Sequence, residues 1–244
     1  MAQVSRRAGF NGSALVRLLS RLTDTDVRES AQGTADRLSQ WFGWTDAISL
    51  SAALNGNPAP ALPGARTSRT SASAEEGECI RARSALAQAI AEDGMFADGA
   101  PSGTASDFAP YRQRYLARQQ AMDAGVGPLR GRLRARLATG SADMARLAAV
   151  DVVMEQVLGT RERSLLANLP SVLERHFGRL RQAAAEAQVK ADDEPGDAAA
   201  PEAWLDVFRK DARELLLAEL DFRFQPVEGL LEALRSRTTG QPDT

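Results

Sequence analysis

The sequence predicts an all-α protein, a multi-helix bundle of amphipathic helices joined by polar linkers. Apolar residues recur at intervals of three and four, as they do on the buried face of a helix. No segment alternates β-branched and polar residues as a half-buried strand does. The helical periodicity is interrupted by stretches rich in proline, glycine, serine or acidic residues, the composition of linkers, at 55–73, 93–106 and 190–201.

These interruptions suggest how the chain is divided. A chain of 244 residues is long enough to bury a substantial core without disulfides or metals. We expect an N-terminal helical unit over 1–54, a flexible linker over 55–73, a helical bundle over 74–236 with a disordered acidic loop at about 189–201, and a tail over 237–244.

Short helices are expected in the N-terminal unit. Ser13 is placed to cap the first of them. A second helix should contain Trp41, and a third should begin near Thr45, after the break at Gly43. The buried stripe of the first helix would consist of Leu15, Leu18, Leu19 and Leu22.

Two serine–glutamate pairs, Ser73 with Glu76 and Ser171 with Glu174, have the spacing of a capping box. Each pair predicts the start of a helix. Glu75, Glu76 and Glu78 would then lie in the first turn of a helix, where a negative charge complements the helix dipole. We therefore interpret them as part of a helix start and not as a catalytic cluster.

The stretch GVGPLRG over 125–131 has the glycines of a dinucleotide-binding loop at the wrong spacing. No strand precedes it, so the crevice that holds a pyrophosphate in such proteins would be missing. We interpret Gly125, Gly127 and Pro128 as a break between two helices. The next helix should begin near Ser141.

The C-terminal region has the strongest helical pattern of the chain. Pro226 should kink this helix or end it near Gln225, because proline has no amide hydrogen to donate. The helix would either close the core or be completed by a partner. Its apolar stripe consists of Trp204, Phe208, Ala212, Leu216, Leu220, Phe224, Val227, Leu231 and Leu234. The acids expected on a solvated face or at a helix start are Glu219, Asp221, Glu228 and Glu232.

The chain offers few groups for catalysis or metal binding. It has one cysteine and one histidine, which excludes an internal disulfide and any two-histidine metal site built from one chain. His176 shares a helical face with Phe177, as a structural histidine would. An active site around His176 and Glu174 is the weakest of the hypotheses. The acids before Cys79 would raise the pKa of its thiol, which makes Cys79 a poor candidate nucleophile. We therefore expect no catalytic residue, no metal, no cofactor and no enzymatic activity.

Charge is distributed unevenly along the chain. Residues 111–181 contain thirteen arginines and six acids, whereas residues 186–221 contain eleven acids and four basic residues. The acidic C-terminal helix is expected to dock on the basic bundle, in its own chain or in a second copy. The alternative function is a nucleic-acid-binding regulator that uses the alternate arginines of one helix. These are Arg130, Arg132, Arg134 and Arg136.

No stretch approaches the roughly 20 apolar residues that span a bilayer. The first residues are not followed by an apolar run of signal-peptide length. A cytoplasmic protein without direct membrane insertion is therefore expected.

Two phrases of the sequence carry a family resemblance. SRLTDTDVRESAQGTADRLSQWFGWTDAISLSAAL near the N-terminus and AELDFRFQPVEGLLEAL near the C-terminus resemble a proteobacterial family of unknown function. That family supplies no catalytic residues to transfer. Its genes often lie beside genes for MotA/TolQ-type and OmpA/MotB-like envelope proteins, so the resemblance implies an accessory of an ion-driven envelope complex.

Together these observations predict a non-enzymatic helical protein that binds other proteins. The expected partners are envelope-complex subunits or a second copy of the chain, and nucleic acid is the less favoured partner. Large apolar side chains dominate protein interfaces. The residues expected to contact a partner are Trp41, Trp44, Trp204, Phe208, Phe222, Phe224 and Leu231.

Overall fold

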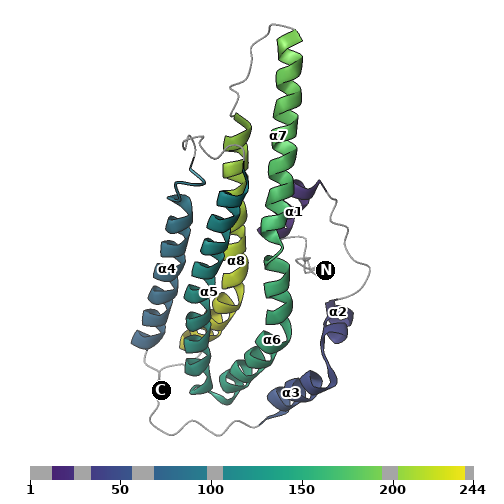
Figure 1. The fold of residues 1–244 in the computed structure, drawn as a ribbon. Coiled ribbons are helices and arrows are strands. Elements are labelled where there is room, and N and C mark those ends of the chain that lie inside the picture. Colours follow the sequence, from purple (N-terminus) through teal and green to yellow (C-terminus); the bar gives the residue numbers. More distant parts are fainter. Residues whose placement is uncertain (1–12, 25–33, 57–68, 98–106, 194–202, 240–244) are drawn as a thin grey trace, which may run out of the picture. The chain divides into compact units, whose positions relative to one another are not determined.

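The computed structural model describes residues 13–24, 34–56, 69–97, 107–193 and 203–239. Within these ranges the chain forms α-helices and no strand, which confirms the all-α prediction (Figure 1). The helices are α1 (Ala14–Thr23), α2 (Thr34–Trp41), α3 (Trp44–Asn55), α4 (Arg69–Ala91), α5 (Ala109–Ala138), α6 (Ala142–Leu166), α7 (Leu169–Asp193) and α8 (Ala203–Thr239).

The helices belong to two compact units that are discontinuous in sequence. Unit 1 comprises residues 1–29, 87–120 and 168–222, and unit 2 comprises the remaining residues, 30–86, 121–167 and 223–244. Helices α4, α5 and α8 each contribute residues to both units. Helix α1 belongs to unit 1, whereas α2 and α3 belong to unit 2.

Unit 1 has an aromatic core. The ring of Phe208 in α8 lies edge-on to Tyr111 of α5 and to Phe177 of α7, with centroids 5.1 and 5.0 Å apart. Such edge-to-face contacts add to the stabilisation from burial. Helix α1 lies against α7 (Figure 1) and buries the predicted leucine stripe except Leu19, which is partly exposed. Ser13 is the N-cap residue of α1, but its side chain makes no capping hydrogen bond.

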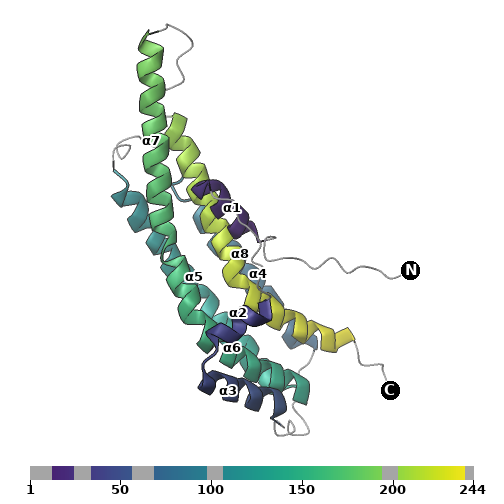
Figure 2. The same cartoon turned by 90° about the vertical axis from the view of Figure 1, so that its right-hand side faces the viewer.

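Unit 2 has an aliphatic core. Leu133 and Leu137 of α5 are completely buried, and Leu230 and Leu234 of α8 are nearly so. Helix α3 lies beside α6 in both views (Figures 1 and 2). None of the residues of α3 is buried, so a large part of its circumference is at the surface.

The stripe predicted for the C-terminal helix is buried, with Trp204 partly exposed. Helix α8 does not end at Gln225 but continues through Pro226 to Thr239. Proline costs one backbone hydrogen bond, but Phe224 and Val227 on either side of it are 1% exposed. Packing of these two residues stabilises the helix across the proline.

The predicted break over 125–131 is wrong, because α5 is one helix from Ala109 to Ala138 with Pro128 inside it. Val126 and Leu129, which bracket the proline, are buried. Most of the stability of a protein helix comes from packing of its apolar face and not from local propensity. Here that packing outweighs the cost of three glycines and a proline.

Two of the four predicted helix starts on serine, those at Ser73 and Ser171, are wrong. Ser141 does cap α6, since its side chain accepts a hydrogen bond from the amide of Met144. Helix α4, however, begins at Arg69, ahead of Ser73, and α7 begins at Leu169, ahead of Ser171. The serine–glutamate spacing also occurs inside helices, so it marks a start only where no earlier residue continues the helix.

Candidate functional site

The candidate site is the exposed side of α3, which we call the α3 face. Trp44 is 83% exposed, Ile48 53% and Leu54 50%. Large apolar side chains at the surface of a helix are unusual when they gather on one element. The α3 face consists of Trp44, Thr45, Ala47, Ile48, Ser49, Ser51, Ala52, Leu54 and Asn55, all of which are exposed.

Both ends of α3 have a clear local cause. At the start, the amide of Gly43 donates a hydrogen bond of 3.0 Å to the carboxylate of Asp46. At the end, the amide of Gly56 bonds to the carbonyl of Ala52, and a Cβ on residue 56 would lie 2.7 Å from that oxygen. Glycine is therefore required at 56, and the length of α3 is set by its own sequence.

Trp41, at the end of α2, is 38% exposed. The guanidinium of Arg161 in α6 lies 5.1 Å from the centre of its ring, which is the geometry of a cation–π contact. Trp41 thus has a partner in its own chain on one side. Of the seven residues predicted to contact a partner, Trp44 is part of the α3 face, and Trp41 lies in the same unit at the end of α2.

The other five predicted contact residues are in α8, and three of them are buried in the core. Phe208, Phe224 and Leu231 are buried in the chain itself. Trp204 and Phe222 are partly exposed. Sequence reasoning missed Ile48 and Leu54, although one signal was available: α3 contains a single ionisable residue among twelve.

The four alternate arginines of α5 pair with acids on two neighbouring helices. Arg130 and Arg134 bond to Asp151 of α6, at 2.7 and 3.0 Å, and Arg134 also bonds to Glu155 at 2.6 Å. Burial alone would lower the pKa of Arg130, but the hydrogen bond and charge of Asp151 outweigh it and raise that pKa. Both arginines are partly buried.

Arg132 and Arg136 point to the other side of α5, toward α4. Arg132 forms an ion pair with Glu78, and Arg136 lies 3.8 Å from Glu75. Glu76 pairs with Arg235 of α8. Glu75, Glu76 and Glu78, interpreted from the sequence as a first helical turn, thus lie inside α4 and form ion pairs with α5 and α8. The four arginines proposed to contact nucleic acid all pair with acids of their own chain.

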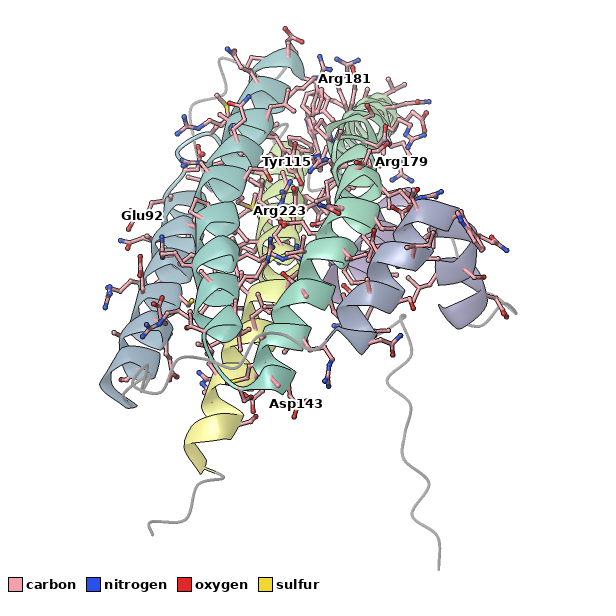
Figure 3. The ribbon with its side chains drawn as sticks, turned by 90° about the horizontal axis from the view of Figure 1, so that it is seen from below. Glu92, Tyr115, Asp143, Arg179, Arg181 and Arg223 are labelled. Atoms are coloured by element: carbon pink, nitrogen blue, oxygen red, sulfur yellow. The ribbon has the colours of Figure 1, made fainter. Side chains whose placement is uncertain are left out.

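A charged cluster lies inside unit 2. Arg223 of α8 forms an ion pair with Asp123 of α5, and Figure 3 shows Arg223 between the helices, whereas Asp143 points outward. Burial raises the pKa of Glu162 in α6; Arg223 and Arg130 lower it, but they do not cancel the effect of burial. The charge of Glu162 is thus only partly compensated by these arginines.

His176 lies in a network that joins α1, α7 and α8 in unit 1. Its Nε2 is 2.8 Å from Asp211 Oδ2, and a guanidinium nitrogen of Arg179 is 3.4 Å from its Nδ1. Since arginine can only donate, Nδ1 accepts and Nε2–H donates to Asp211. Arg179 (Figure 3) also bonds to the carbonyl of Leu22, and Arg21 bonds to Asp211. The network fixes the end of α1.

Glu219 of α8 was expected on a solvated face, but its residue is completely buried. It accepts hydrogen bonds from the hydroxyl of Tyr115 at 2.9 Å and from the side chain of Gln119 at 3.0 Å. Tyr115 lies in the interior between α5 and α8, whereas Glu92 lies on the outer side (Figure 3). Buried polar groups need such partners, so this prediction is corrected by the packing of α5 on α8.

The described part of the molecule includes a groove in each unit that touches residues discussed above. One, of about 480 Å³, lies between α4 and α8 beside Cys79, where burial and then Glu75 and Glu78 raise the pKa of the thiol. The other, of about 510 Å³, lies between α1 and α7, with apolar side chains and two arginines, Arg175 and Arg179, in its lining. Because its pKa is raised, the thiol of Cys79 is protonated and a poor nucleophile, as expected from the sequence.

Within the described residues, no three side chains of the histidine, cysteine, aspartate and glutamate types gather closely enough to hold a metal ion. None of the helices described combines the length and the apolar character that crossing a membrane requires.

Comparison with curated proteins and with solved structures found no match to this chain. A family model described as "Protein of unknown function (DUF3348)" matches residues 1–236. The match includes both phrases on which the resemblance was based and extends over α1 to most of α8. The chain therefore belongs to the DUF3348 family.

Proposed function

We propose that this protein is a non-enzymatic helical protein that works by binding another protein through the α3 face. The observation that carries the proposal is the exposure of Trp44, Ile48 and Leu54 on a helix with a single ionisable side chain. Helices that are apolar around most of their circumference are normally buried on several sides. A bound protein would supply the side that α6 leaves open.

A structural role for His176 supports the non-enzymatic part of the proposal. Both of its ring nitrogens are engaged, one by Asp211 and the other by Arg179. A general base needs a free lone pair within reach of a substrate proton. The buried Glu219 likewise accepts hydrogen bonds from its own chain.

The family resemblance suggests the setting in which such a protein would act. We propose a cytoplasmic accessory of an ion-driven envelope complex, with subunits of that complex as partners. Co-purification of tagged protein with the products of neighbouring envelope genes would support this setting. Absence of those products from the purified complexes would contradict it, without affecting the role of the α3 face.

The role of the α3 face is tested by photo-cross-linking in cells. A photoreactive amino acid at position 44 should give a specific protein adduct, because Trp44 is the most exposed large apolar residue of the described chain. The same group at position 165 is the matched control, since Leu165 is 69% exposed on α6. Loss of the adduct when Ile48→Asp is added would assign it to the α3 face. Equal adducts at positions 44 and 165, or none, would reject the proposed function.

A further inference from the structure

The α3 face contains a straight stripe. Trp44, Ile48, Ser51 and Asn55 follow one another at intervals of four, three and four residues, and all four are exposed. At about 100° of rotation per residue, these four side chains lie within about 60° of one another. This is the spacing of the contact seam between two helices of a coiled coil.

The flanks of the stripe are uncharged. Ala47 and Leu54 lie on one side of it and Ala52 on the other, and all three are exposed. The one ionisable side chain of α3, Asp46, bonds to the amide of Gly43 at the helix start. In coiled coils, charged flanking positions select the partner helix. A charged partner helix would here bury its charges without counterions, so the matching surface must itself be uncharged.

Resting on the proposed function, we propose that the partner is a second copy of this chain, with two α3 helices packed antiparallel about a two-fold axis. A two-fold contact places each surface on itself, so that an uncharged face meets an uncharged face. Among the helices that the structure describes, α3 has the fewest ionisable side chains, so the best match on this chain is α3 itself. An axis between Ile48 and Ser51 pairs Ile48 with the partner's Ser51 and Trp44 with the partner's Asn55.

The composition of α3 favours a second copy over a lipid surface. Helices that lie on anionic membranes carry lysine and arginine on their polar side. Helix α3 contains neither. Its small residues Ala47, Ser51 and Ala52 would instead let two helix backbones approach closely, with a Trp44 ring covering each end of the contact.

The size of the contact determines how the dimer should behave. A helix of 12 residues is about 18 Å long. Stable complexes bury about 1,200–2,000 Å² in total, and a single helix pair of this length falls at or below the lower end. The α3–α3 dimer should therefore dissociate on dilution, and its detection requires a concentration series.

Sedimentation velocity on the full chain, from low to high micromolar concentration, tests the proposal. The wild type should pass from monomer to dimer with rising concentration, whereas Ile48→Asp should remain monomeric throughout. Ile48 is exposed, so this variant should keep the circular dichroism spectrum of the wild type. Leu165→Asp places the same charge on an exposed apolar residue of α6 and should still dimerise.

A cysteine cross-link locates the axis. Cys79 is buried and is the only cysteine, so a cysteine introduced by Ser51→Cys can be addressed selectively. A short bis-maleimide should convert Ser51→Cys to covalent dimer, because residue 51 lies near the proposed axis. Ser84→Cys, exposed on α4 of the same unit, should give none.

The results separate this inference from the proposed function on which it rests. A wild type that is monomeric at every concentration, or a dimer that survives Ile48→Asp, overturns the two-fold α3 contact. If the photoreactive group at position 44 then captures a different protein and Ile48→Asp abolishes that adduct, the proposed function stands with another partner. Dimerisation that Ile48→Asp abolishes, together with the Ser51→Cys cross-link, establishes the second copy.

Discussion

Acids with little exposure in this protein are stabilised in different ways. Asp93 is 2% exposed and pairs with Arg114 and Arg118 at 2.7 and 2.5 Å. Glu219 accepts hydrogen bonds from uncharged tyrosine and glutamine side chains. Burial raises the pKa of Glu162 despite the nearby arginines. A raised carboxyl pKa means that the folded protein disfavours the charge, so Glu162 is where removing a charge should help.

We predict that Glu162→Gln raises the free energy of unfolding at pH 7. Because folding raises the pKa of Glu162, the folded state binds a proton more readily than the unfolded state. The contribution of Glu162 to stability therefore falls as pH rises from the ordinary glutamate pKa, about 4.3, through the raised value in the fold. Glutamine carries no charge and avoids this loss.

The test is thermal unfolding of both proteins at pH 7 and near pH 4. The variant should melt higher than the wild type at pH 7, and the difference should shrink near pH 4, where Glu162 is largely protonated in both states. Glu155→Gln in the same helix is the control. It should give no gain at pH 7, because Glu155 bonds to Arg134 at 2.6 Å. An equal difference at both pH values would show that charge at residue 162 is not the cause.

Which acids are buried could not be read from the sequence. Glu219 is followed by Leu220 and lies among other acids, so it reads as part of a solvated face. Its partners Tyr115 and Gln119 lie one helical turn apart on α5, about a hundred positions earlier in the chain. Only the packing of α5 on α8 brings them together. The directions of the alternate arginines of α5 could be predicted from helix geometry, whereas their acidic partners could not.

The helices themselves were predictable, and their ends were not. A stripe of apolar residues over many turns predicts a long helix, as it did for α8. Glycine, proline and capping residues act over one turn, and tertiary packing overrides them in α5 and α8. The α3 face was predictable in part, since Trp44 was selected but the uncharged stripe around it was not.

The glycines of α5 give a prediction about this helix. Gly127→Ala should raise the free energy of unfolding by roughly 0.5–1 kcal/mol, because alanine loses less backbone entropy in a helix than glycine. A Cβ at Gly127 meets nothing within 4 Å. Gly125→Ala is the matched comparison and should gain less, because its Cβ would lie 3.1 Å from Leu86 Cδ1. Urea unfolding measures both, and a larger gain at 125 than at 127 would contradict the prediction.

The division into two units is a property of the whole chain that linkers did not reveal. Each unit is assembled from three separate ranges, and α4, α5 and α8 contribute to both. A composition shift marks where a chain is free of regular structure, but not which helices pack together. The ion pairs follow the same rule, since Arg132 and Arg235 reach acids of α4 that lie far from them in sequence.

Burial of apolar side chains, and not ion pairing, should dominate the stability of the whole protein. Many of its arginine pairs are exposed; the side chains of Arg132 and Glu78, for instance, are each 45% exposed. Exposed pairs contribute about 0–1 kcal/mol each, and at 1 M salt the Debye length falls to about 3 Å. Raising NaCl from 0.05 to about 1 M should therefore lower the free energy of unfolding only slightly.

Leu133→Ala, at a completely buried position, should lower the free energy of unfolding by about 2–5 kcal/mol. Urea unfolding of both proteins at both salt concentrations gives the comparison. A loss in high salt greater than that from Leu133→Ala would show that the arginine network, and not the core, stabilises the fold.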